Sequence, residues 1–234
     1  MCFSIEADLI VGTAVTAVGV HAIRAASSRA NKILATVPIL LGAHLLVEAV
    51  VWWAVDGSGP DWAGDIATWL YLAIALTIVP IAVPVAVLAA EASPQRRGVI
   101  GVFVGLGTFA AGALFNALLT GPVSAEVDGH HIAYATGVSN GGLLVAIYVI
   151  GTCGAALASS SKDLAAFGAI NLAVVLVLIW VQETALISLW CAWAAITSIL
   201  ITYRIHMEPA PLPPQPQQRG RRHLQSAARV RRLH

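Results

Sequence analysis

The sequence predicts an all-α fold, a polytopic membrane protein that forms a bundle of seven transmembrane helices. Hydrophobic residues make up 58% of the 234 residues and charged residues only 11%, whereas about a quarter of the residues in soluble domains are charged. Seven apolar segments follow one another, each close to the length that crosses a bilayer. All lysines and arginines lie in the connections on one side of these segments.

The predicted spans take up most of the chain, so residues 1–205 are predicted to form a single transmembrane domain. In chain order the spans are Ala7–Ile23, Ile33–Val55, Ile66–Ala90, Val99–Leu119, Gly141–Ala158, Leu164–Val181 and Ala185–Tyr203. Only Gln182, Glu183 and Thr184 separate the last two. At about 1.5 Å per residue, this combined tract is roughly twice the thickness of the hydrocarbon core, so the chain must turn back at the polar triplet.

The charges in the connections predict the orientation of the bundle. The basic residues are Arg24, Arg29, Lys32, Arg96, Arg97 and Lys162, together with seven arginines that follow Ile201. The opposite side carries Glu6, Asp8, Asp56, Asp61, Asp65, Glu126, Asp128 and Glu183. Because short cytoplasmic loops are rich in lysine and arginine, the sequence predicts a multi-pass plasma-membrane protein with the N-terminus outside and the C-terminus in the cytoplasm.

The predicted span Ile33–Val55 contains two titratable side chains. His44 and Glu48 lie in the half of this span that is nearer to the acidic loops. A charged side chain at such a depth costs roughly 3 kcal/mol on insertion scales, and intramembrane ionisable residues are mostly functional. The i, i+4 spacing places both side chains on one helix face. We therefore expect an outward-facing polar pocket around His44 and Glu48.

Other polar residues at a similar predicted depth complete this pocket. The predicted ligand-binding residues are His44, Glu48, Asn116, Gln182, Glu183 and Ser188. A divalent metal ion such as zinc is one expected cofactor, because histidine and carboxylate side chains are suitable ligands for it. The predicted metal ligands are His44 and Glu48, with further ligands from Cys2, Glu6, His130 and His131.

Three functions are compatible with this pattern, and whether the protein is an enzyme stays open. In the leading hypothesis the pocket binds a small ligand, a proton or a metal ion, and the protein is a sensor or a carrier. The alternative is a membrane-embedded, metal-dependent enzyme that acts on a lipid or a small amphiphile, with His44 as a ligand and Glu48 as a ligand or general base. In the third, the pair only specifies helix packing.

Several better-known classes do not fit the sequence. A retinal protein needs a lysine in the bundle core, but Lys32 and Lys162 lie in the predicted inner loops. A transmembrane b-type haem needs two facing histidines, and only His44 lies deep in a predicted span. Phosphate-binding glycine loops and the HExxH motif do not occur. Ceramidase-like hydrolases use several membrane histidines, and the seventh predicted span has none.

The segment 206–234 is predicted to be a disordered cytoplasmic tail. It begins with the proline-rich stretch PAPLPPQPQQ and continues with six arginines. Arginines near the membrane surface attract anionic lipid headgroups by about 1 kcal/mol each. The expected partners are therefore the lipid bilayer and anionic headgroups, and no nucleic acid is expected. Gly101 and Gly105 form a GxxxG motif, which predicts close helix packing and is compatible with a homo-oligomer.

Four segments carry a resemblance to a known group of proteins: MCFSIEAD at the start, AHLLVEAVVWW in the second predicted span, TCGAALASS at the end of the fifth and SLWCAWAA in the seventh. Together they resemble a family of uncharacterised bacterial integral membrane proteins whose chains begin Met-Cys-Phe-Ser. The likeness runs from Met1 to about Tyr203 and omits the tail. It implies the seven-span outline, and it directs attention to Cys2 as a ligand, thiol or modification site.

Overall fold

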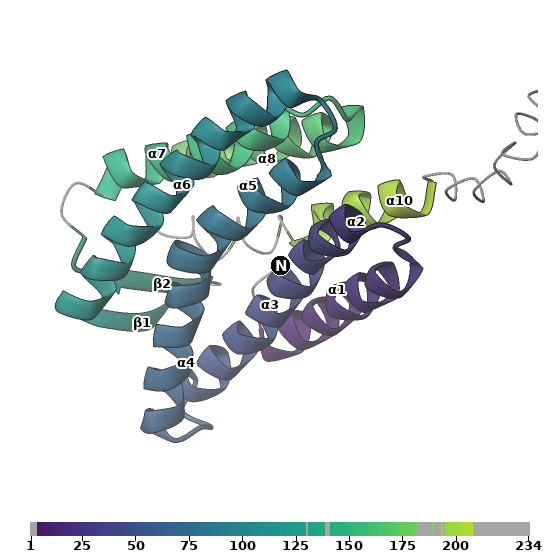
Figure 1. Cartoon of the computed structure of the whole chain (residues 1–234). Coiled ribbons are helices and arrows are strands. Elements are labelled where there is room, and N and C mark those ends of the chain that lie inside the picture. Colours follow the sequence, from purple (N-terminus) through teal and green to yellow (C-terminus); the bar gives the residue numbers. More distant parts are fainter. Residues whose placement is uncertain are drawn as a thin grey trace, which may run out of the picture.

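The computed structural model describes residues 4–129, 131–138, 141–181, 189, 193 and 195–207. These residues are mostly helical, and a two-stranded hairpin lies at one end of the helical bundle (Figure 1). The elements are α1 (Ile5–Ala25), α2 (Arg29–Leu34), α3 (Thr36–Val55), α4 (Asp61–Ala73), η1 (Ile74–Ile78), α5 (Val79–Ala90), α6 (Pro94–Thr120), β1 (Val123–Asp128), β2 (His131–Thr136), α7 (Gly141–Leu157), α8 (Lys162–Val181) and α10 (Ile199–Met207).

Several helical segments have the length and composition of membrane spans. Five are long and apolar enough to cross a membrane: Ile5–Ala25, Arg29–Val55, Asp61–Ala90, Pro94–Thr120 and Lys162–Trp180. Helix α7 is also apolar, but it is shorter, with 17 residues. The predicted seventh span, Ala185–Tyr203, falls largely outside the described residues. The helical architecture is thus confirmed, whereas the number of seven spans and the sides of the termini stay predictions.

The second predicted span is divided into two helices by a break at Ala35. Helix α2 ends at Leu34 and α3 begins at Thr36. Pro38 lies just inside α3 and lacks the backbone N–H that a continuous helix would donate to the carbonyl of Leu34. Ser28 caps the start of α2, because its hydroxyl accepts the N–H of Asn31 at 3.0 Å. The break therefore follows from the position of one proline.

The third predicted span contains a π-helical turn ahead of its prolines. In η1 the N–H of Val79 donates to the carbonyl of Ile74, five residues earlier. The same pattern would pair the carbonyl of Ala75 with Pro80, which has no N–H. Instead, the hydroxyl of Tyr148 on α7 donates to the carbonyl of Ala75 at 2.9 Å. A side chain of a neighbouring helix thus satisfies the carbonyl that the proline leaves without a donor.

Close helix packing depends on a glycine other than those of the predicted GxxxG motif. A Cβ atom added at Gly107 on α6 would collide with the carbonyl oxygen of Pro80 on α5. In contrast, nothing lies within 4 Å of a Cβ atom added at Gly101 or Gly105. The expected packing at the motif is therefore not found in the described part of the chain, and the close approach of the two helices takes place at Gly107 instead.

The connection between α6 and α7 forms a hairpin, which the all-α prediction missed. Strands β1 and β2 pair antiparallel, with Asp128 opposite His131 and Ala125 opposite Tyr134. Gly129 adopts a φ of 63° in the turn, a left-handed conformation that glycine reaches without strain. Ile132 is fully buried, so β2 packs its inner face against the helices.

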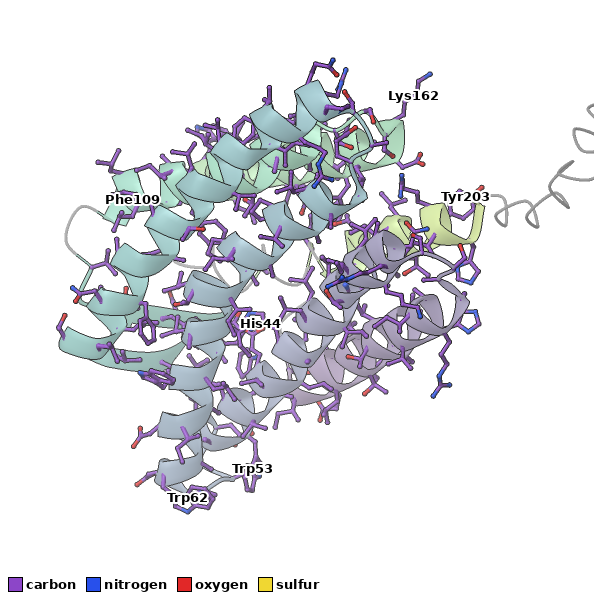
Figure 2. All side chains as sticks on the ribbon, in the orientation of Figure 1. His44, Trp53, Trp62, Phe109, Lys162 and Tyr203 are labelled. Carbon is purple, nitrogen blue, oxygen red and sulfur yellow. The ribbon has the colours of Figure 1, made fainter. Side chains whose placement is uncertain are left out.

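Several basic residues lie at one end of the bundle, and Trp53 and Trp62 lie at the other. The guanidinium group of Arg96 donates to the carbonyl of Ser159 at 2.9 Å, and that of Arg204 donates to the hydroxyl of Ser161 at 2.8 Å. These contacts bring three basic connections together. Figure 2 shows Lys162 at this end, whereas Trp53 and Trp62 lie at the opposite end.

Candidate functional site

Helix α3 carries the two ionisable side chains that the sequence singles out. His44 and Glu48 are both 0% exposed, and they lie one turn apart on the same face of α3. Figure 2 shows His44 in the middle of the molecule. Close packing of α1 on α3 contributes to this burial, because a Cβ atom added at Gly42 would lie only 2.6 Å from the backbone nitrogen of Thr16. The histidine and the glutamate are therefore enclosed by the fold.

Three aromatic rings from three different elements form a stack at His44. The ring of His44 on α3 lies 4.0 Å from that of Tyr71 on α4, at an interplanar angle of 15°. Tyr71 in turn stacks on Tyr134 of β2, with ring centroids 4.6 Å apart and an interplanar angle of 16°. The ring of Tyr71 thus covers one face of the imidazole, and the ring of Tyr134 lies on the other side of Tyr71.

Glu48 belongs to the same group of side chains. The hydroxyl of Tyr134 donates to Oε1 of Glu48 at 3.3 Å. Glu48, His44, Tyr71 and Tyr134 are referred to below as the His44 cluster. The hairpin thus contributes one member of the cluster, and it covers the face of α3 on which the two ionisable residues lie.

The imidazole of His44 has hydrogen-bonding capacity that its surroundings do not use. Neither Nδ1 nor Nε2 has a hydrogen-bond partner among the residues that the structure describes. A buried polar group that loses its partners costs about 1–3 kcal/mol. A water molecule or a small guest that forms a hydrogen bond with one of these nitrogens would therefore stabilise the cluster.

Two of the predicted site residues do not join this cluster. Glu6 and Asn116 are exposed. Asn116 lies on the side of α6 opposite to Leu114 and Leu118, which are buried in the bundle. Asn116 was predicted to lie near Glu48 because the two residues have a similar depth in the predicted spans. The orientation of α6 about its own axis, however, directs the Asn116 side chain away from the bundle.

Of the remaining predicted ligands, the structure describes only His131. His131 is buried, and its Nε2 lies 3.6 Å from Oδ2 of Asp128 at the turn of the hairpin. The predicted residues Cys2, His130, Gln182, Glu183 and Ser188 lie outside the described residues. Within the described part of the chain, no group of three or more His, Cys, Asp or Glu side chains is placed to hold a metal ion. The predicted metal site is therefore not supported.

Neither Tyr71 nor Tyr134 was predicted as a site residue from the sequence. Tyr71 is completely buried in the apolar segment Asp61–Ala90. A tyrosine deep inside a predicted span was a usable signal, because a buried phenol needs a partner. For Tyr134 the signal was weaker, since the contact with Glu48 depends on the hairpin folding back onto α3.

A second buried carboxylate, Glu91, lies at the basic end of the bundle and was also missed. It accepts hydrogen bonds from the N–H and the hydroxyl of Ser160, both at 2.7 Å, and from Ser93 and Ser159. Burial alone raises the pKa of the Glu91 carboxyl, but these hydrogen bonds outweigh it and lower the pKa to about 2. Glu91 thus ties the connection between α5 and α6 to the one between α7 and α8 as a carboxylate.

Comparison with known proteins gives a family but no activity. No curated protein and no solved structure matches the chain significantly. One family model, described as a family of unknown function, matches residues 1–216, which is most of the chain. The expectation of an uncharacterised family is thereby confirmed. The chain belongs to the family of unknown function DUF6629.

Proposed function

We propose that this protein is a seven-span protein of the plasma membrane that binds and releases a proton at the His44 cluster, as a carrier or a sensor. Its N-terminus is outside and its C-terminus is in the cytoplasm. The proposal has two parts, the membrane location and the chemistry of the cluster, and they are supported by different observations.

The membrane location is supported by the surface of the helices and by the distribution of charge. Large apolar side chains such as Phe109, Leu143 and Trp180 are exposed on different helices, as expected for residues that face lipid. Five helical segments are long and apolar enough to span a bilayer. The basic connections meet at one end of the bundle, and the positive-inside rule assigns that end to the cytoplasm.

The observation that carries the proposed chemistry is the burial of an imidazole with two unpartnered nitrogens one helical turn from a buried carboxyl group. Such a pair can hold one mobile proton as neutral imidazole with carboxylic acid, or as imidazolium with carboxylate. Tyr134 donates to Glu48 in the second form, and the stacked ring of Tyr71 stabilises the imidazolium.

The size of the guest follows from the enclosure of the cluster. Because both side chains are 0% exposed, neither His44 nor Glu48 is accessible to a metabolite in this conformation. A metal ion generally needs three or four protein ligands, and the cluster offers one imidazole and one carboxylate. A proton needs neither an open cavity nor further ligands, which makes it the guest that the geometry supports best.

Proton flux into liposomes tests this function. Purified protein is reconstituted with a pH-sensitive dye inside, and the external pH is lowered in one step. A carrier acidifies the interior, and both His44→Gln and Glu48→Gln abolish the effect. The matched control is Asn171→Leu, because Asn171 is also a buried polar residue of a span but donates to the carbonyl of Phe167, outside the cluster.

A sensor gives no flux, but its carboxyl group still changes its protonation state with pH. If neither flux nor a protonation change depends on His44 and Glu48, and their variants only lower thermal stability as Asn171→Leu does, the cluster is a packing device and the proposal is wrong.

A further inference from the structure

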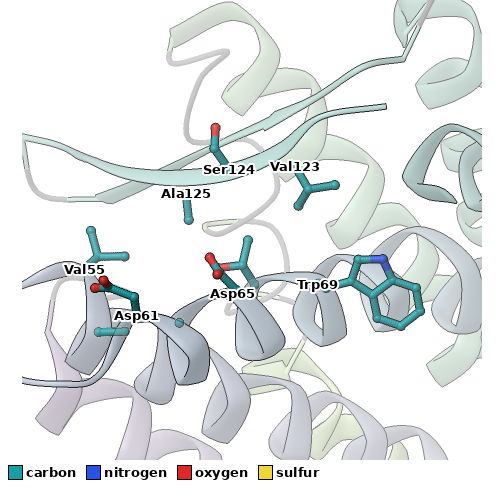
Figure 3. A pocket seen from close by; sticks show the side chains of 10 residues that line it. Val55, Asp61, Asp65, Trp69, Val123, Ser124 and Ala125 are labelled. Atoms are coloured by element: carbon teal, nitrogen blue, oxygen red, sulfur yellow. The ribbon is translucent and has the colours of Figure 1, made fainter. Parts of the chain in front are cut away.

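A separate pocket lies between α4 and the hairpin, at the acidic end of the bundle (Figure 3). Its volume is about 600 Å³. Val55 at the end of α3 and Val123 on β1 contribute apolar walls, and Ser124 and Ala125 on β1 also line the pocket. No member of the His44 cluster lines it. An inference about this pocket is therefore independent of the function proposed for His44 and Glu48.

Helix α4 presents two carboxylates and one indole to the pocket. Asp61, Asp65 and Trp69 follow one another at intervals of four residues, so they form one stripe along the helix. In Figure 3 both carboxyl groups lie beneath the strand that carries Ser124 and Ala125, and Trp69 lies further along the helix. The stripe thus combines negative charge with an aromatic surface.

No basic side chain on the described pocket wall compensates the negative charge of the two aspartates. Neither lysine nor arginine is among the described residues that line it. Asp61 and Asp65 are like charges one turn apart, an arrangement that destabilises a helix by roughly 0.2–0.5 kcal/mol. A bound cation would remove this repulsion.

Thr68 also lines the pocket, and it is only 5% exposed. It adds a buried polar side chain to the wall that α4 contributes.

We propose that this pocket binds a small organic cation, an amine or a quaternary ammonium compound. Carboxylates and an indole ring are the groups that recognise organic cations, through charge and through the face of the ring. The apolar walls suit the alkyl groups of such a ligand, and a volume of about 600 Å³ lies in the range of small-molecule sites. A bare metal ion would leave most of this space and the indole unused.

Binding of choline to the full-length protein in lipid nanodiscs tests the proposal. Calorimetry compares choline with its neutral isostere, in which a quaternary carbon replaces the ammonium nitrogen, and with calcium chloride. We expect choline to bind with one site per chain, to weaken as salt is added, and to bind far more tightly than the isostere. Equal binding of the isostere would overturn the proposal, because the pocket would then be merely apolar.

Variants assign the binding to the pocket. The double variant Asp61→Asn/Asp65→Asn should reduce choline affinity at least tenfold. Trp69→Leu should reduce it by about fivefold, and Trp69→Phe should retain part of it. The matched control is Glu126→Gln, an exposed acid of β1 outside the pocket wall, which should bind choline as the wild type does.

Two outcomes contradict the assignment. Choline affinity that is unchanged in the double aspartate variant, although this variant is folded and melts like the Glu126→Gln control, would place the ligand elsewhere. Stoichiometric calcium binding that depends on Asp61 and Asp65, without choline binding, would make the pocket a divalent cation site instead.

Discussion

The hydroxyl of Tyr134 lies 3.3 Å from Oε1 of Glu48, although the two residues are 86 positions apart in the chain. This contact joins the hairpin to a carboxyl group enclosed in helix α3. A change in the protonation of Glu48 therefore changes what holds the hairpin in place, and a movement of the hairpin changes the environment of Glu48. The cluster and the hairpin are coupled by this hydrogen bond and by the stack of Tyr71 on Tyr134.

Replacing Tyr134 by phenylalanine removes this hydrogen bond and keeps the aromatic ring. We expect Tyr134→Phe to lower the free energy of unfolding by about 1–3 kcal/mol, because a buried carboxyl group loses a donor. Thermal unfolding in detergent measures the effect. Tyr203→Phe is the control, since Tyr203 is 62% exposed, and equal melting temperatures of the two variants would contradict a stabilising contact.

The π-helical turn before Pro80 makes a similar prediction for Tyr148. In Tyr148→Phe the carbonyl of Ala75 loses its donor while the ring remains. The expected loss of stability is about 1–3 kcal/mol. Combining the variant with Pro80→Ala restores a backbone N–H near this carbonyl, so the two changes should not be additive. Strict additivity in a double-mutant cycle would argue against this role of Tyr148.

The hydrogen bonds of Glu91 predict a pH dependence of stability. Since they lower the pKa of Glu91 from 4.5 to about 2, the stabilisation is fully present above about pH 4.5 and is lost as the pH falls toward 2. Glu91→Gln should thus be less stable than the wild type at neutral pH, by roughly 1–3 kcal/mol, and the difference should shrink in acid.

Melting temperatures measured over this pH range check the prediction for Glu91. Asp163→Asn serves as the control, because Asp163 is an exposed acid in the first turn of α8, close in sequence to Ser159 and Ser160. A difference between wild type and Glu91→Gln that stays constant from neutral pH to pH 2 would show that the carboxylate form has no special role.

Two glycines of α6 should respond in opposite ways to the same substitution. Gly107→Ala forces its Cβ atom against the carbonyl of Pro80, which should destabilise the protein by about 1–3 kcal/mol. Gly101→Ala meets open space and should be neutral or stabilising by up to about 1 kcal/mol, since alanine favours helices. A destabilising Gly101→Ala would instead indicate that another chain packs on this face of α6.

Much of the helical architecture follows from hydrophobicity alone. Six apolar windows correspond to helical segments in the structure, because membrane-length apolar runs have few other stable conformations. Local chemistry decides the details: Pro38 accounts for the break at Ala35, and Pro80 for the π-helical turn. The hairpin was missed although Gly129 is the first residue of a two-residue hairpin loop, a position that favours glycine, since the residues around it were interpreted as a loop between spans.

Only those residues of the site could be predicted whose side chains are unusual for their position in the sequence. His44 and Glu48 are conspicuous in the sequence alone, because placing such side chains in an apolar span is costly. The stack of Tyr71 and Tyr134 depends on how three elements meet, and Glu91 depends on contacts with serines 68 and 69 positions away. Asn116 was predicted from its depth in the span alone. Depth does not determine the rotation of a helix about its axis, and therefore does not determine whether a side chain faces the bundle.

The central claim is that Glu48 exchanges a proton inside the bundle, and infrared difference spectroscopy tests it most directly. Spectra of the reconstituted protein are recorded at acidic and alkaline pH, where a buried carboxylic acid has a C=O stretch separate from that of a carboxylate. The account predicts a pH-dependent carboxyl band that disappears in Glu48→Gln, persists in Asn171→Leu and shifts its titration in His44→Gln. An identical pH-dependent spectrum of wild type and Glu48→Gln would contradict it.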